Sequence, residues 1–397
     1  MVQDVKGKVD KNFLSSFNTK SLPSIQTDVL VIGSGVAGLC AAIEAAKYSK
    51  VLIVTKDKLR ECNTDRAQGG IAVVLSQGDS FKSHIEDTIR VGSGLCNEEA
   101  VRILVEEGPF RIQEFIQWGV EFDKKDGNLS FTQEAGHSMR RIIHAKGDAT
   151  GHEIERTLIL KVKKNKNIKI LEHTFVIDLL HRDGICFGVI VDIENEGRKA
   201  VYAQKTILAT GGIGQIYRET TNSIVATGCG MALAYRAGAY LMDMEFVQFH
   251  PTTLYIAGAS RSLISETVRG EGGMLKNKYG ERFMFKYHRE GELAPRDVVS
   301  RAIFREMKKT GDTHVYLDLN HLDSQFLKRR FPSITEACSF FGIDIKKDMI
   351  PVRPTAHYMM GGIKIDIKGK TNISNLYACG ECACLGLHGA NRLASNS

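Results

Sequence analysis

The stretch Asp28-Val29-Leu30-Val31-Ile32-Gly33-Ser34-Gly35-Val36-Ala37-Gly38 decides the fold of this chain. The apolar, β-branched run that follows the aspartate predicts a strand buried in a parallel sheet. The glycines after it are spaced as in a dinucleotide-binding turn. Gly33 permits a tight turn, Gly35 lets the backbone approach a pyrophosphate, and Gly38 lets a helix pack closely against the strand.

The segments after this turn complete a strand–helix–strand unit. Residues 39–48 are rich in alanine and predict a helix, and residues 51–54 predict the next strand. The N-terminus of such a helix offers unpaired amide groups to phosphates. The second strand ends in Thr55-Lys56, where an NAD site places an acidic residue for the ribose. The sequence therefore argues against ordinary NAD binding. The alternative to a dinucleotide site of any kind is a glycine turn that binds no ligand.

Bulk properties bear on the class of protein. The chain has 397 residues, of which 43% are hydrophobic and 25% charged, and no apolar run reaches the ~18 residues of a spanning helix. Nine cysteines without framework spacing predict reduced thiols and a cytoplasmic location. The net charge of +7 reads mostly as a dispersed, solvated surface, so neither a nucleic acid nor a membrane is expected as a partner.

The order of these patterns predicts an α/β fold, with a Rossmann-like nucleotide-binding domain and an inserted α+β capping domain. The expected parts are a polar N-terminal extension at 1–26, the first part of the nucleotide-binding domain at 27–241, the capping and substrate domain at 242–354, and a return segment at 355–397. Within them we expect helices at 98–118, 150–161 and 231–239, a loop at 123–128, paired strands at 168–180 and 184–192, and a strand at 200–208 that resumes the first sheet.

Several longer motifs occur together in one order. They are Ala67-Gln68-Gly69-Gly70, Gln248-Phe249-His250-Pro251-Thr252, Arg269-Gly270-Glu271-Gly272, Pro295-Arg296-Asp297-Val298-Val299, His357-Tyr358-Met359-Met360-Gly361-Gly362 and His388-Gly389-Ala390-Asn391-Arg392-Leu393-Ala394-Ser395-Asn396. With these motifs the chain resembles the flavoprotein subunits of succinate dehydrogenase and fumarate reductase from about residue 28 to residue 397. Within that superfamily it is most similar to the L-aspartate oxidase family, and the resemblance implies FAD as cofactor.

Two positions separate the subfamilies. Succinate dehydrogenases and membrane-linked fumarate reductases carry a histidine bonded covalently to FAD where this chain has Asn63, so the flavin is expected to be held non-covalently. The loop at 132–138 resembles the aspartate-oxidase version, in which a glutamate, here Glu134, faces the substrate amino group. No feature of the sequence suggests a quinone or iron–sulfur partner.

The resemblance implies that FAD contacts the glycine turn, the end of the second strand, the polar run after it and three later positions. The residues expected at the cofactor are Gly33, Ser34, Gly35, Val36, Ala37, Gly38, Lys56, Asn63, Thr64, Asp65, Arg66, Ala67, Gln68, Gly69, Gly70, Cys229, Glu381 and Ser397. Cys229 departs from the family, which has aspartate there, and this puts that contact in doubt. Three cysteines around Glu381 allow a metal site as an alternative, but they lack a matched second half, so no metal is expected.

The resemblance also implies a dicarboxylate site. Its binding residues are His357, Arg392 and Ser265, and its catalytic residues are Arg296, His250, Glu134 and Glu266. A planar guanidinium suits a carboxylate, and the histidines add directed donors. Arg296 is expected to transfer a proton, with Glu266 or Glu271 as its relay partner. A carboxylate-binding arginine without a proton role is the alternative.

The reaction implied is FAD-dependent oxidation of L-aspartate to iminoaspartate, with oxygen or fumarate as electron acceptor. In the family this is the first step of NAD biosynthesis, and quinolinate synthase consumes the product. The alternatives are a soluble fumarate reductase with non-covalent FAD, or an inactive, truncated flavin-binding remnant. The chain ends at Ser397, inside a motif that in the family opens a helix directed at the flavin, so we expect either a fragment or a naturally short form.

Overall fold

The structure is a computed structural model that describes residues 13–256 and 262–397, and within them its largest element is a seven-stranded sheet. The strands lie in the order β8-β2-β1-β11-β10-β9, with β18 beside β11. Their bounds are Ser24–Ile32 (β1), Val51–Val54 (β2), Ile168–Leu171 (β8), Thr174–Arg182 (β9), Ile185–Ile193 (β10), Gly197–Leu208 (β11) and Leu376–Ala378 (β18). Strands β8, β2, β1, β11 and β18 run parallel, and β10 is antiparallel to both of its neighbours, β11 and β9.

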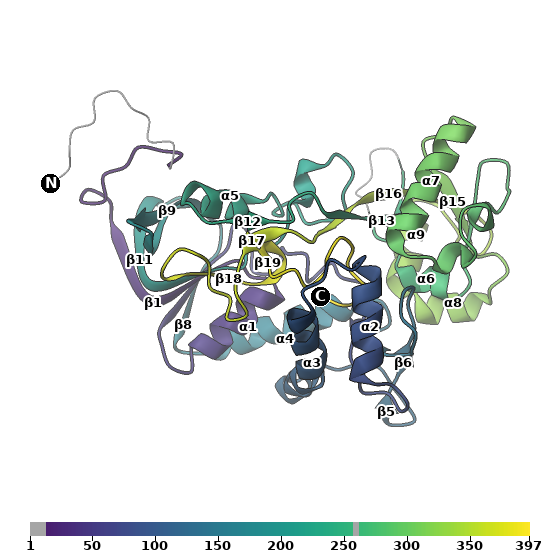
Figure 1. Cartoon of the computed structure of the whole chain (residues 1–397), viewed down its shortest axis with the longest axis horizontal. Helices are drawn as coiled ribbons and strands as arrows, with labels where there is room; N and C mark the ends of the chain where they lie inside the picture. Colours follow the sequence, from purple (N-terminus) through teal and green to yellow (C-terminus); the bar gives the residue numbers. More distant parts are fainter. Residues whose placement is uncertain (1–12, 257–261) are drawn as a thin grey trace.

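Both faces of this sheet are covered, as its apolar strands predict. Val31 packs in one core with α1 and α4, and its neighbour Leu30 packs in another core with α5 and β17. Figure 1 shows α1, α3 and α4 below the sheet, with α5, β12, β17 and β19 above it. The bounds are Val36–Ala45 (α1), Glu98–Trp118 (α3), Thr150–Lys164 (α4), Cys229–Arg236 (α5), Leu241–Met242 (β12), Gly362–Lys364 (β17) and Ala383–Cys384 (β19).

A second, antiparallel sheet lies at the other end of the molecule in Figure 1, packed with the helices α6 to α9. Its strand order is β13-β16-β15-β14, and Phe283, Ile303 and Val352 belong to its fully buried core. The bounds are Val247–Leu254 (β13), Met274–Lys276 (β14), Val315–Asp318 (β15), Ile350–Met359 (β16), Glu266–Gly270 (α6), Arg296–Thr310 (α7), Ser324–Arg330 (α8) and Pro332–Phe340 (α9).

Smaller elements join the two ends. They are α2 (Phe81–Val91), the small sheet of β3 (Ile71–Ala72), β7 (Ile142–Ile143) and β6 (Phe131–Thr132), the hairpin of β4 (Lys124–Lys125) and β5 (Asn128–Leu129), and the 3-10 helices η1 (Gly214–Ile216), η2 (Met284–Lys286), η3 (Gly291–Leu293) and η4 (Gly380–Cys382). The C-terminus lies beside α2 (Figure 1), where His84 contacts Asn396 at 2.7 Å.

The structure confirms the α/β class and the return of the strand at 200–208 to the first sheet, where it pairs with β1, but several predicted bounds were wrong. The helix predicted at 39–48 begins at Val36, directly after the extended Gly35, and ends at Ala45. The strand predicted at 168–180 is two strands, because the chain turns at His173, whose φ is 49°. The loop predicted at 123–128 contains the β4–β5 hairpin, and α2 was not predicted.

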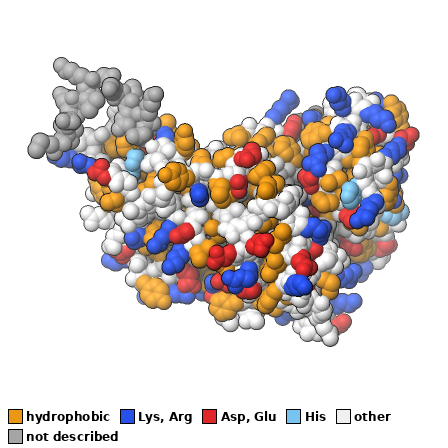
Figure 2. All heavy atoms as spheres, in the orientation of Figure 1, with side chains coloured by type: hydrophobic (Ala, Val, Ile, Leu, Met, Phe, Trp, Pro, Cys, Tyr) orange, Lys and Arg blue, Asp and Glu red, His pale blue; other side chains and the backbone are white. Residues whose placement is uncertain are grey.

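Two surface properties bear on possible partners. Among the described residues, none of the helices is both long enough and apolar enough to cross a lipid bilayer. On the face shown in Figure 2, basic side chains are widely spread and are most numerous over the end that carries α7 and α8. These two helices end in basic residues, namely Lys308 and Lys309 on α7 and Lys328, Arg329 and Arg330 on α8.

Candidate active site

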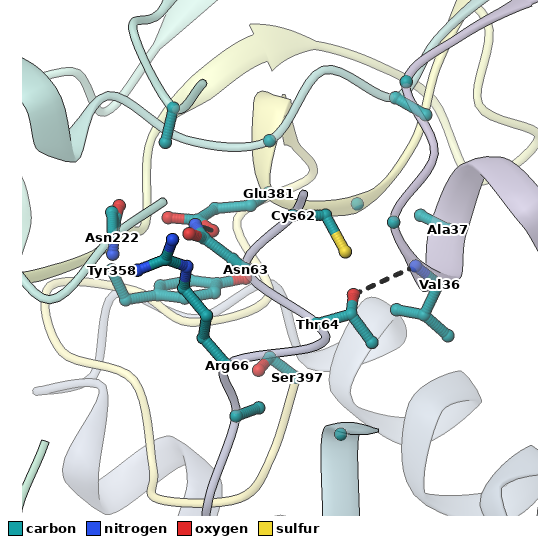
Figure 3. Close-up of a pocket in the computed structure, with 18 of the residues that line it drawn as sticks. Val36, Ala37, Cys62, Asn63, Thr64, Arg66, Asn222, Tyr358, Glu381 and Ser397 are labelled. Carbon is teal, nitrogen blue, oxygen red and sulfur yellow. Dashed lines mark hydrogen bonds between the residues drawn. The ribbon is translucent and has the colours of Figure 1, made fainter. Parts of the chain in front are cut away.

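One large cavity, of about 1630 Å³, brings the predicted site residues together. Every residue predicted to contact the cofactor or the substrate lines this cavity except Gly38. Gly38 instead packs against the turn before it, since a Cβ there would lie 2.1 Å from the carbonyl oxygen of Gly33. Figure 3 shows that the labelled residues converge from distant segments, with Val36 and Ala37 on one side and Tyr358 and Asn222 on the other.

The glycine turn has the geometry of a phosphate site. Gly33 has φ of 115°, and a Cβ there would lie 2.1 Å from the carbonyl oxygen of Ala209, so only glycine fits. No side chain caps α1 from its N-cap residue, Gly35. The amide of Val36 donates to the Thr64 hydroxyl at 3.0 Å (Figure 3). The first turn of α1 therefore faces the cavity and can accept an anion.

In the polar run after β2, Asn63 is held by hydrogen bonds to other parts of the protein. Asn63 Oδ1 accepts from the Ser223 amide at 2.8 Å, and Asn63 Nδ2 donates to Glu381 at 3.5 Å. Glu381 also accepts from the Met359 amide at 2.9 Å, and burial raises the pKa of this carboxyl. Asn63 is thus committed to bonds within the protein, which suits a flavin held without a covalent link.

Other predicted cofactor residues that line the cavity are held by side-chain contacts of their own. Lys56 Nζ donates to Thr227 at 2.8 Å and to the carbonyl of Val225 at 3.1 Å, so it ties β2 to the loop before α5. Cys229 opens α5 and is a half-buried free thiol. Further side-chain contacts join Ser34 to Thr55 at 3.0 Å, Asp65 to His152 at 2.9 Å, Arg66 to Glu61 at 2.7 Å and Ser397 to Arg392 at 2.5 Å.

Two arginines at the far end of the cavity share one amide side chain. Gln248 Oε1 accepts from Arg296 Nη1 at 2.9 Å and from Arg392 Nε at 3.4 Å. Arg392 also contacts His357 Nε2 at 3.1 Å, and its guanidinium lies 4.0 Å from the ring centre of Tyr358. Burial, with Arg296 nearby, lowers the pKa of Arg392 to about 10. Two cations held this close in a buried site suit a ligand with two carboxylates.

Glu266 pairs with both neighbouring guanidinium groups. Its carboxylate lies 2.5 Å from Arg296 Nε and 3.4 Å from Arg269 Nη2, and all three side chains are buried. Burial alone would raise the pKa of Glu266, but the two arginines hold it below its usual value. Of the two partners considered for Arg296, the structure pairs it with Glu266, whereas Glu271 lies 3.5 Å from Arg330.

Of the two predicted histidines, His250 is buried and His357 is half-buried, and their ring centres lie 5.2 Å apart. Burial, reinforced by Arg296 for His250 and by Arg392 for His357, holds the pKa of each well below its usual value. His250 Nδ1 lies 3.1 Å from the Thr252 carbonyl oxygen and 3.3 Å from the Thr252 amide nitrogen, whereas His250 Nε2 is a buried atom without a partner. A buried polar atom left unpaired in a cavity suits contact with a ligand.

Glu134 is a buried carboxylate that lines the cavity. One oxygen accepts from Thr267 at 3.1 Å and the other from Ser395 at 2.6 Å. Within the described ranges 13–256 and 262–397, no Lys, Arg or His nitrogen lies within 4.0 Å of it. Because Glu134 lines the cavity, a cationic ligand bound there would supply the counter-charge that this carboxylate lacks.

Comparison with known proteins places this geometry in a family. The sequence profile of the FAD binding domain family matches residues 28–397. An L-aspartate oxidase of Ralstonia nicotianae is 49% identical over 93% of this chain and 71% of its own length. The chain belongs to the L-aspartate oxidase family. Its cofactor is FAD, which the cavity fits through the glycine turn before α1, which lines the cavity, and through the buried, unpartnered oxygen of Gln68.

Two further L-aspartate oxidase relatives are longer than this chain. The one from Streptomyces coelicolor is 47% identical over 94% of the chain, and the chloroplastic one from Nicotiana tabacum is 49% identical over 93%. The chain spans 66% and 59% of their lengths, respectively. Among solved structures, the quinol fumarate reductase of E. coli matches with a TM-score of 0.90 at 38% identity, covering 95% of this chain and 68% of that one.

Several residues of the site were not singled out from the sequence. Gln248, Thr267 and Ser395 contact predicted residues, yet only Gln248 and Ser395 lie within a quoted motif. The position of Gln248 two residues before His250 in β13 was a usable signal. No local pattern marks Thr267, whose partner Glu134 is 133 residues away.

Proposed function

We propose that this chain oxidises L-aspartate to iminoaspartate with FAD as the electron acceptor, and that oxygen or fumarate reoxidises the cofactor. The observation that carries the proposal is Glu134, a buried carboxylate without a cationic partner in a cavity that otherwise presents arginines and histidines. A dicarboxylate without an amino group has no use for a carboxylate there. An ammonium group would bind the Glu134 carboxylate through charge-assisted hydrogen bonds.

Different residues bind the two carboxylates and the ammonium group of the substrate. Arg392, with His357 beside it, binds one carboxylate, and Arg296, with His250 Nε2, binds the other. Glu134 holds the ammonium group and takes up the proton that leaves the nitrogen. FAD, when bound, accepts the hydride from Cα. Fixing both carboxylates and the nitrogen orients the Cα–H bond, which is the protein's main contribution to the rate.

When fumarate is the electron acceptor, Arg296 donates a proton to one alkene carbon, bound reduced FAD would supply the hydride that the other carbon needs, and Glu266 passes a proton back to Arg296. The 2.5 Å contact between Arg296 Nε and Glu266, with Arg269 behind it, supports this relay. A fumarate reductase with non-covalent FAD is the second candidate function, because the same buried relay serves it without any role for Glu134.

We also propose that the reaction is the first step of NAD biosynthesis, that quinolinate synthase consumes the product and that the chain works in the cytoplasm. The first two statements rest on family resemblance. The third rests on the nine cysteines, all of them free thiols.

Glu134→Gln tests the role of this carboxylate. We expect kcat/KM for L-aspartate to fall about 100-fold, because a buried charge pair is lost, and fumarate reduction to change little. Glu134→Asp keeps the charge and serves as the matched variant. If steady-state assays show both activities of Glu134→Gln falling equally, the assigned role is wrong.

A further inference from the structure

The two hydroxyl groups that bind Glu134 come from opposite parts of the molecule. Thr267 lies in α6, beside Ser265 and Glu266, and Ser395 lies in the segment after β19. Each binds a different carboxylate oxygen, at 3.1 Å and 2.6 Å. We propose that Ser395 and Thr267 are positioning residues that orient Glu134 and so give the site its preference for an amino dicarboxylate. This inference rests on the proposed function.

Ser395 is held in an unusual conformation. Its φ of 57° lies in the left-handed region, which non-glycine residues adopt at a cost of about 1 kcal/mol or more. Its carbonyl accepts from the Ala72 amide at 2.8 Å, and the carbonyl before it contacts His137 Nε2 at 2.8 Å. The residue after it is held by His84 at 2.7 Å. Contacts on both sides thus fix the backbone that aims the Ser395 hydroxyl at Glu134.

Thr267 connects Glu134 to Ser265 through two hydrogen bonds between side chains. A carboxylate supplies no hydrogen, so the Thr267 hydroxyl must donate to Glu134, and its oxygen accepts from the Ser265 hydroxyl at 3.1 Å. Ser265, predicted as a substrate donor, is therefore linked to Glu134 through Thr267. The residue between them is Glu266, the partner of Arg296, so one short helix ties the amino-group site to the relay.

The arrangement leaves Glu134 ready for an ammonium group. Each of its oxygens carries more than one acceptor position, so one hydroxyl bond per oxygen leaves room for a ligand donor. The two hydroxyls fix the plane of the carboxylate from two sides. Removing either one frees the group to rotate and weakens its hold on an ammonium, whereas Arg392 and His357 keep their own contacts. The loss should therefore fall on L-aspartate and spare succinate.

The test compares the two ligands on the FAD-loaded chain without oxygen. Succinate binding is taken from the change in flavin absorbance on titration, and the Kd for L-aspartate from the way the rate of flavin bleaching saturates with L-aspartate concentration in a stopped-flow experiment. For Ser395→Ala and Thr267→Val we expect Kd for L-aspartate to rise about five- to tenfold, with less than about a twofold change for succinate. Thr355→Val is the matched control. It removes a buried hydroxyl, bonded to Thr253 at 2.8 Å, from the sheet that carries His250, and should change neither ligand's Kd.

The outcomes are separable. If both ligands weaken equally, or if L-aspartate binding is unchanged, Ser395 and Thr267 do not position Glu134 and the inference is overturned. If Ser395→Ala does not fold, Thr267→Val alone decides between these outcomes. A wild-type chain that binds succinate and turns over no L-aspartate overturns the proposed function instead, before any variant is compared.

Discussion

Replacing Glu266 by glutamine removes the anion between two buried cations. Glu266 is 3% exposed and Arg269 1% exposed, and the carboxylate lies 2.5 Å from Arg296 and 3.4 Å from Arg269. Glutamine keeps the shape of the side chain and can still accept one hydrogen bond. It leaves the positive charges of Arg296 and Arg269 without a buried counter-charge, so the change isolates the electrostatic part of the contact.

The expected loss follows from this geometry. Breaking a buried ion pair by removing one partner costs about 3–5 kcal/mol. Folded proteins are stable by only about 5–15 kcal/mol, so the loss is a large fraction of the whole. For a chain of this size we expect the melting temperature of Glu266→Gln to fall by roughly 4–6 °C. Proton transfer through Arg296 should fall about 100-fold or more.

Thermal unfolding of the FAD-free chain measures the first effect, and fumarate reduction by the loaded chain measures the second. Glu306→Gln is a matched control, because Glu306 is equally buried but is bonded by neutral groups, Asn277 at 2.9 Å and Tyr287 at 2.8 Å. We expect its unfolding free energy to fall by only about 1 kcal/mol. Equal melting temperatures for the two variants would refute the reasoning that charge, not shape, is what Glu266 contributes.

Three further predictions concern two substitutions and one pH series. Gly33→Ala places a Cβ 2.1 Å from the Ala209 carbonyl oxygen at a φ of 115°, so we expect the purified variant to carry little FAD. An absorbance spectrum with the full flavin content would contradict this expectation. Burial raises the pKa of Glu155 from 4.5 to about 8. Between these two pH values the carboxyl is protonated in the folded chain and ionised in the unfolded chain. The stability of the wild type therefore falls as the pH rises from about 4.5 to about 8. Glu155→Gln should therefore gain stability over wild type between pH 5 and pH 8, by roughly 5 kcal/mol at most, and a difference that is flat with pH in urea denaturation would contradict this. Burial and the neighbouring arginines hold the pKa of His250 and His357 well below 6.5, so succinate affinity should show no inflection near pH 6.5 in a titration series.

Local sequence was sufficient where a short pattern fixes a short structure. The turn from Gly33 to Gly38 determined the strand, the helix and the phosphate end of the cavity, because steric limits on glycine act within a few residues. The bound at 39–48 was wrong because the helix begins directly after Gly35, while the alanine-rich composition marks only its middle. The single strand at 168–180 was wrong because apolar composition carries no sign of the turn at His173.

The sequence predicted which residues form the site, but not which of them contact one another. Motif resemblance found Arg296, Arg392 and Glu134, since each lies in or beside a recognisable run. It did not show that Gln248 holds the first two together, or that hydroxyls from two distant segments hold the third. These contacts join residues separated by 48 to 261 positions, so they depend on how the two sheets are placed and not on any local pattern.

The most direct test is to mix the purified, FAD-loaded chain with L-aspartate, D-aspartate or succinate without oxygen and follow the flavin absorbance. We predict that L-aspartate bleaches the flavin, that D-aspartate and succinate do not, and that FAD is released on denaturation. Succinate bleaching the flavin while L-aspartate leaves it yellow would contradict the assignment of Glu134 and the function built on it.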